Sequence, residues 1–189
     1  MANKVKYGLK SLYYAKGTVD ASTSVITYST PVAWQGAVSI SLDPQGDLAT
    51  FRADNTDYWV GQNNNGYQGD LECALVPEDF RKDILGEVVD NGGNLVEVVQ
   101  PSLTHFALLF QVEGDENATR HALYNCTASR PGVNAETTAE SIEPSTETVT
   151  ITAHPTPSTA LNKDVVKSRN SSTTSTSYSA WFTAVQVPT

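Results

Sequence analysis

The sequence predicts a mainly β protein, a β-sandwich or barrel-like domain with one short flanking helix at about residues 77–85. Charged residues make up only 17% of the 189 residues, while threonine, serine, valine and asparagine are abundant, a composition typical of strands. Most segments alternate apolar and polar residues with the period of a half-buried strand, and one segment alone carries clear helix signals. The chain is long enough for one domain with a complete core.

The first part of the chain predicts three strands. Residues 7–15 and 24–28 have strand-like alternation on either side of the turn-like sequence "KGTVDAST". Residues 37–43 alternate branched apolar residues with serines, so one face of that strand is expected to be buried.

Residues 44–69 predict a long loop, because glycine, asparagine and aspartate dominate them. Loops of this length are usually functional or disordered. This one carries Phe51, Tyr58, Trp59 and Tyr67, and we expect these aromatic rings to dock on another surface.

The one strong helix signal lies at residues 77–85. Pro77 suits the first turn of a helix, and the two acids that follow it lie where the positive end of the helix dipole favours them. Phe80 and Ile84 share one face of the helix. Gly86 then ends it, because glycine adopts the left-handed conformation of a helix C-terminus.

The second half of the domain predicts two hairpins and a further strand. Residues 87–99 form the first hairpin, around an Asn-Gly pair. Residues 105–128 form the second, and its first arm, 105–112, is apolar on both faces and needs cover on both sides. One face is expected to pack on the core, and the other can meet a partner. Residues 147–153 predict the last strand of a domain that spans residues 1–155.

Two segments follow this domain. Residues 156–177 are rich in serine, threonine and proline and predict a linker. Residues 178–189 predict a C-terminal aromatic arm with Tyr178, Trp181 and Phe182. Because an apolar tail beyond a polar linker needs cover, the arm is expected to dock on the domain's own core or on a neighbour.

Both cysteines are predicted to be buried and unreactive. In the strand 70–76, Cys73 shares the apolar face with Leu75, and Cys126 lies on the apolar face of the second hairpin's return strand. His121 falls on the opposite face from Cys126, which argues against a His/Cys hydrolase. Two free thiols are favoured over a disulfide, because no secretion signal is recognised.

The net charge of −9 comes from the middle of the chain, since residues 43–155 are strongly acidic and both ends are basic. An acidic body does not suit gripping nucleic-acid phosphates. No metal-ligand spacing, phosphate-binding glycine loop or nucleophile motif is recognised, and no segment is apolar enough to span a membrane. We therefore expect no enzyme activity, cofactor, metal site or membrane contact, and synthesis in a cytosol.

Four blocks of the sequence resemble a known family: "YGLKSLYYA", "GYQGDLECALVPEDFRKDILGE", "FALLFQVEGDENATRHALYNCTASRPG" and "IEPSTETVTITA". They are similar to the major tail proteins of long-tailed bacteriophages of Gram-positive hosts, over about residues 5–155 and more weakly over 178–187. The resemblance implies a β-sandwich or barrel-like tail-tube domain whose hexameric rings stack into a tube. Genomic DNA would pass through its lumen, and the tape-measure, tail-terminator and distal tail proteins would be partners. It also implies a place in the virion tail and assembly in the host cytoplasm.

On this resemblance the candidate site is a subunit interface. Its expected members are the aromatic residues of the loop and the arm, with two arginines near the ends of the return strand: Phe51, Tyr58, Trp59, Tyr67, Arg120, Arg130, Tyr178, Trp181 and Phe182. The arginines could equally be ordinary surface charge. The acidic excess would suit a lumen that repels DNA. The alternative function is a β-sandwich carbohydrate- or cell-surface-binding module that uses the exposed aromatic rings.

Overall fold

The computed structural model of the chain describes residues 3–135, 137 and 144–188. Strands account for 51% of these described residues and helices for 6%, which confirms the mainly β class. In chain order the elements are β1 (Lys6–Val19), β2 (Ile26–Tyr28), β3 (Val32–Trp34), β4 (Ala37–Gln45), β5 (Leu48–Ala53), β6 (Thr56–Gln62), β7 (Gly66–Cys73), α1 (Glu78–Asp83), β8 (Val88–Val89), β9 (Leu95–Val96), β10 (His105–Gly114), β11 (Thr119–Ala128), β12 (Glu147–Ala153), β13 (Thr156–Ser158), β14 (Lys163–Val165), β15 (Lys167–Asn170) and α2 (Thr176–Ser179). The predicted hairpins after α1 are both present, with shifted ends.

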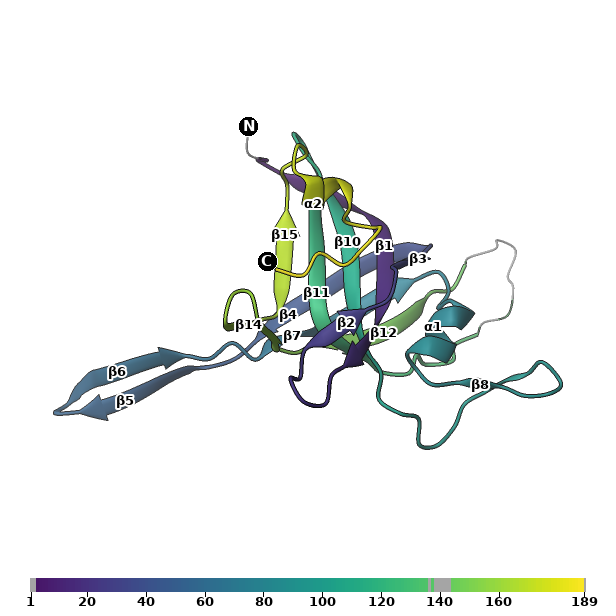
Figure 1. Cartoon of the computed structure of the whole chain (residues 1–189), viewed down its shortest axis with the longest axis horizontal. Coiled ribbons are helices and arrows are strands. Elements are labelled where there is room, and N and C mark those ends of the chain that lie inside the picture. Colours follow the sequence, from purple (N-terminus) through teal and green to yellow (C-terminus); the bar gives the residue numbers. More distant parts are fainter. Residues whose placement is uncertain (1–2, 136, 138–143, 189) are drawn as a thin grey trace.

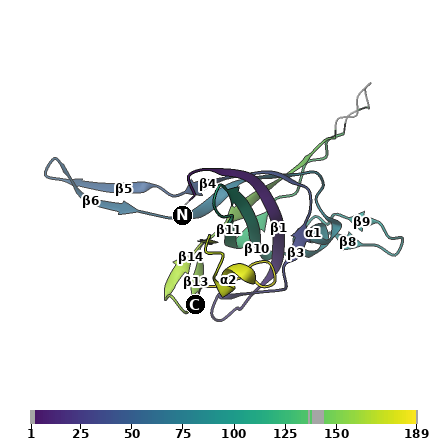
Figure 2. The same ribbon diagram turned by 90° about the horizontal axis from the view of Figure 1, so that it is seen from above.

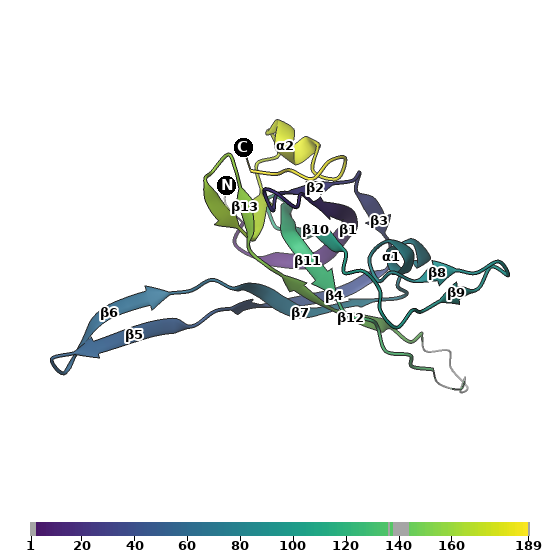
Figure 3. The same cartoon turned by 60° about the horizontal axis from the view of Figure 1, so that its bottom comes forward.

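One antiparallel sheet of nine strands forms the body. Its strands follow the order β2-β1-β10-β11-β12-β7-β4, with β3 added to β1 and β15 added to β11. The sheet folds over on itself, so that β4, β7 and β12 form one layer and β1, β10 and β11 form the other (Figure 3). Each layer can therefore bury one face against the other, as the sandwich-like prediction requires.

The main core lies between the layers, and α1 closes one end of it. Phe80 of α1 is fully buried, and its ring centroid lies 4.4 Å from that of Trp34 and 5.4 Å from that of Phe106. The helix begins after the extended Pro77, and Gly86 adopts a φ of +74° beyond its end, as predicted. Because burial of one phenylalanine stabilises a fold by about 1.5–3 kcal/mol, packing holds this short helix in place.

A second, smaller core covers the other face of β10 and β11. Leu109, Ala122 and Tyr124 are buried there together with Trp181 from the C-terminal arm. The prediction that β10 needs cover on both sides is thus confirmed. The cover comes from the chain's own arm, which Figure 1 shows lying across β10 and β11.

The segment predicted to be a long loop, 44–69, is a projecting β-hairpin instead. β4 continues to Gln45, β5 pairs with β6, and β7 begins at Gly66. The hairpin extends away from the body in two perpendicular views (Figures 1 and 2). Its two-residue turn uses Asp54 and Asn55 at φ values of 51° and 63°, the left-handed pair that such a hairpin turn requires. Part of the polar sequence that predicted a loop therefore forms the turn of this hairpin.

The prediction of a linker at residues 156–177 is also wrong. Its first part forms the small hairpin of β13 and β14, and β15 pairs with residues 120–123 of β11. β15 has the sequence "KSRN", which has no apolar alternation. Backbone hydrogen bonds to β11 hold this strand, so its side chains need not be apolar.

β11 contains an irregularity that the alternation rule did not predict. Asn125 has a φ of 46°, and the pairing with β10 slips between Leu108–Leu123 and Phe106–Cys126. Cys126 consequently faces the main core with Leu123, whereas alternation had placed these two on opposite faces.

Candidate functional site

The hairpin of β5 and β6 carries a group of exposed apolar side chains. Phe51 and Trp59 are partners across the two strands, and 60% and 57% of their surfaces are exposed. Tyr58 is 72% exposed, and Leu48 and Val60 are also more than half exposed. Exposed apolar patches of this kind mark interaction surfaces. Three of the predicted interface residues, Phe51, Tyr58 and Trp59, therefore lie exposed on one hairpin.

Local contacts within the hairpin fix the positions of its exposed side chains. The indole of Trp59 lies over Gly61, where any side chain would collide with the ring. Near the tip, Arg52 Nε lies 3.2 Å from Asp57 Oδ1 and joins the two strands. The rings of Phe51 and Trp59 can thus present one continuous surface along the hairpin.

Tyr67 lies apart from the other three aromatic residues. It belongs to the start of β7, packs partly buried against the main core, and has Lys167 Nζ 4.1 Å from its ring centroid. This cation–π contact ties β15 to the opposite layer. The prediction that Tyr67 lies with the other aromatic residues of segment 44–69 is therefore wrong.

Arg120 is engaged within the chain. Its Cζ lies 3.9 Å from the ring centroid of Tyr178 and 4.9 Å from that of Phe182. Its Nε donates to Gln111 Oε1 at 3.0 Å, and its Nη1 donates to the carbonyl oxygen of Tyr178. The structure therefore uses Arg120 to hold the C-terminal arm, a role that the sequence analysis did not predict.

The arm itself docks on its own core, one of the two outcomes expected from the sequence. Trp181 is buried, and its Nε1 donates to the carbonyl oxygen of His121 at 3.2 Å. The ring of Phe182 stacks on Tyr13 at a centroid distance of 4.7 Å. Tyr178 is also buried, so the aromatic residues of the arm act here as core residues.

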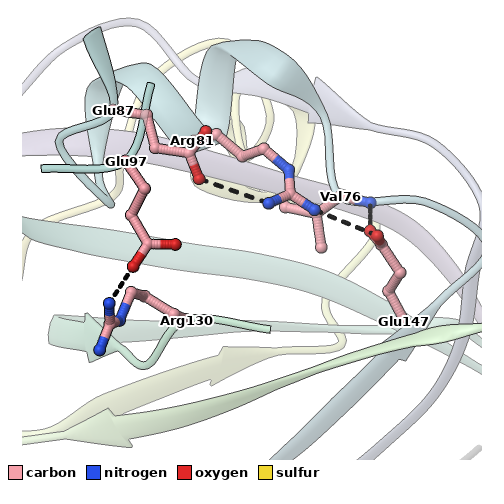
Figure 4. Close-up of polar contacts among 6 residues, drawn as sticks. All are labelled: Val76, Arg81, Glu87, Glu97, Arg130 and Glu147. Carbon is pink, nitrogen blue, oxygen red and sulfur yellow. Dashed lines mark hydrogen bonds and ion pairs between the residues drawn. The ribbon is translucent and has the colours of Figure 1, made fainter. Parts of the chain in front are cut away.

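Arg130 makes an ion pair with Glu97. A separate polar cluster around Glu147 lies nearby (Figure 4). In that cluster the carboxylate of Glu147 accepts the Val76 N–H at 2.6 Å and lies 3.1 Å from Arg81 Nη2. The contacts of Glu147 hold α1 against the start of β12. The ion pair of Arg130 holds the segment after β11 against the end of the β8–β9 hairpin. Arg130 thus has an acidic partner in its own chain, although an exposed pair of this kind contributes little stability.

The outer face of β4, β7 and β12 is mainly polar and acidic, although β4 also exposes Val38 at its bulge. Its side chains form three cross-strand rows, each with one acid: Ser39–Glu72–Thr148, Ser41–Asp70–Thr150 and Asp43–Gln68–Thr152. Hydrogen bonds from Thr146 and Ser39 lower the pKa of Glu72, so this carboxylate stays charged. No lysine or arginine belongs to these rows. We call this surface the acidic face.

The cysteines are free and buried, as predicted. Because of the irregularity at Asn125, the argument that His121 and Cys126 lie on opposite faces is wrong. The reason given first for an unreactive thiol remains, because burial raises the pKa of Cys126 well above its usual value. Leu75 departs from its predicted face and is 66% exposed, since β7 ends at Cys73.

Within the described part of the chain, no three His, Cys, Asp or Glu side chains gather as metal ligands would. None of the helices described is both long and apolar enough to cross a membrane. No protein-family model matches the sequence, and no curated protein is similar enough to match it.

Proposed function

We propose that this chain is a structural subunit whose copies assemble into rings, and whose rings stack into a tube of the phage-tail type. The observation that carries the proposal is the β5–β6 hairpin, which projects from a well-packed body and exposes Phe51, Tyr58 and Trp59. A contact between this hairpin and a different surface of the next copy repeats from copy to copy, and it closes into a ring or continues as a filament. The resemblance of four sequence blocks to tail-tube proteins supports the same reading.

The acidic face is the surface that suits the lumen of such a tube. A wall that carries Asp43, Asp70 and Glu72 without a basic residue repels DNA phosphates, so DNA slides rather than binds. The threonines and serines between the acids keep this wall polar. The alternation of β4, β7 and β12 thus gives each strand an inner side for the core and an outer side for the lumen.

The test is negative-stain electron microscopy of the purified chain over a range of concentrations. We expect rings with a central hole, or hollow tubes, and we expect Phe51→Ser/Trp59→Ser to abolish them while leaving the circular dichroism spectrum unchanged. Val99→Ser/Val133→Ser is the matched control, because both valines are almost fully exposed away from the hairpin. Single particles at every concentration, or tubes from the hairpin variant, would contradict the proposal.

A carbohydrate- or cell-surface-binding module is the second candidate function. The observation that favours it is the exposure of Tyr58 and Trp59 on the same hairpin. Such a module stays monomeric and binds its ligand with these rings. A monomer that binds to a glycan array, and loses that binding with Trp59→Ser, would favour this function over the tube.

A further inference from the structure

A hollow of about 490 Å³ opens between the N-terminal segment 3–6 and strands β4, β7, β10, β11 and β15. Its volume lies within the roughly 300–1,000 Å³ typical of binding pockets. The floor of the hollow is apolar and is formed by Ile40, Leu42, Phe110, Val112 and Leu123. An apolar floor of this kind favours an occupant with apolar side chains.

The rim of the hollow is basic. Lys4, Lys6, Lys167 and Arg169 line it, and no acidic residue does. None of these four side chains forms an ion pair with an acid in the described residues. In a chain of net charge −9, four cations gathered around one opening favour an anionic occupant.

The β5–β6 hairpin has the complementary character. Asp47, Asp54 and Asp57 outnumber Arg52 on it. In the sequence, Phe51 lies between Asp47 and Asp54, and Trp59 follows Asp57 by two residues. The hairpin points away from its own body (Figures 1 and 2), so it is presented to other copies. It combines exposed apolar rings with acids, whereas the hollow combines an apolar floor with a cationic rim.

We infer that the hollow of one copy receives the β5–β6 hairpin of a second copy. Phe51 and Trp59 cover the apolar floor, and the hairpin acids meet Lys167, Arg169 and the other cations of the rim. This inference rests on the proposed function, because it names the two surfaces through which the subunits join. Each copy has one hairpin and one hollow, so the contact is heterologous and can repeat.

A charge swap tests this pairing. The hollow variant Lys167→Glu/Arg169→Glu places acids at two of the four cationic positions of the rim and removes its net positive charge. The hairpin variant Asp47→Lys/Asp54→Lys turns the hairpin basic. Each variant alone then brings like charges together where residues 167 and 169 meet the hairpin, and the net attraction between rim and hairpin is lost. We expect each to raise the concentration needed for half-assembly by at least about tenfold in sedimentation velocity. A 1:1 mixture restores opposite charges at both kinds of contact and should assemble as the wild-type chain does.

The control Lys10→Glu/Lys163→Glu makes the same charge change outside the hollow and should leave assembly unchanged. Wild-type assembly by the single variants, or a mixture that stays dissociated, would overturn the docking while the tube proposal stands on the microscopy. Conversely, a mixture that associates where neither variant does, in a chain that never forms rings or tubes, would support the docking and overturn the tube. A wild-type chain and a mixture that both stay monomeric would overturn both.

Discussion

His121 lies half-buried against Phe110, and the two rings stack at a centroid distance of 5.0 Å. Burial, together with the nearby charges of Lys167 and Arg169, lowers the pKa of His121 from 6.5 to about 4. The folded protein therefore holds the neutral imidazole at pH values where the unfolded chain already binds a proton. Because the unfolded state binds more protons in this window, stability is full above pH 6.5 and is lost as the pH falls towards 4.

We expect His121→Gln to remove this part of the pH dependence. Between pH 6.5 and 4, the wild-type chain should lose on the order of 1–2 kcal/mol more unfolding free energy than the variant does, a figure reduced for solvent screening. Denaturant titrations of both proteins across this pH range measure the difference. Equal losses would show that His121 titrates normally in the folded state.

Cys126 marks the limit of prediction for single residues. Its burial follows from the apolar neighbours in the sequence, and the structure confirms it. Its direction does not follow, because one left-handed residue, Asn125, shifts the alternation of every residue after it. Asparagine tolerates this conformation better than most residues do, but tolerance alone does not show where a strand is irregular.

At the level of elements, the C-terminal arm is the part whose loss is most easily measured. Trp181→Ala removes a buried indole from the second core together with its hydrogen bond to His121. We expect a loss of about 3–5 kcal/mol of unfolding free energy, the usual cost of truncating a buried tryptophan. Val187→Ala, at a half-exposed position of the same arm, should change it by no more than about 0.5 kcal/mol. Similar effects of the two substitutions in denaturant titrations would show that the arm does not pack as described.

The elements that the sequence predicted well are those that bury a regular apolar face. β12 alternates buried Val149 and Ile151 with threonines, and α1 buries Phe80 behind a proline and before a glycine. The hairpin of β5 and β6 and the strand β15 escaped prediction because their backbones pair without a buried side-chain pattern. Their polar or uniformly exposed residues resemble loops, although the Asp54–Asn55 turn was a signal that could have revealed the hairpin.

For the whole molecule, the sequence predicted that aromatic residues would form contacts but not which contacts lie within the chain. Two groups of aromatic residues look alike in sequence. One group, on the arm, packs inside the chain, and the other, on the hairpin, stays exposed. The difference depends on the docking of distant segments, which local patterns do not encode. The role of the hairpin residues as a subunit interface stays a prediction.

The proposed lumenal position of the acidic face can be tested in assembled tubes with one introduced cysteine. The native Cys73 and Cys126 are fully buried, so a maleimide reports on the new thiol. We expect Ser41→Cys, on the acidic face, to react in tubes with a small maleimide and only slowly with one attached to a large polymer, which cannot enter the lumen. Val99→Cys, at a 96% exposed position, should react with both. Equal reaction of Ser41→Cys with both reagents would place the acidic face outside.

The unequal ladders of the main sheet set where the body yields under tension. β4 and β7 pair over most of their length, and so do β7 and β12. β12 pairs with β11 over residues 126–128, with single backbone hydrogen bonds at Asn125 and Ser129 on either side. A pull on the β5–β6 hairpin passes through these ladders in series, and in a series the weakest ladder opens first. We therefore expect the body to yield first at the short β11–β12 pairing, once the core between the two layers gives way.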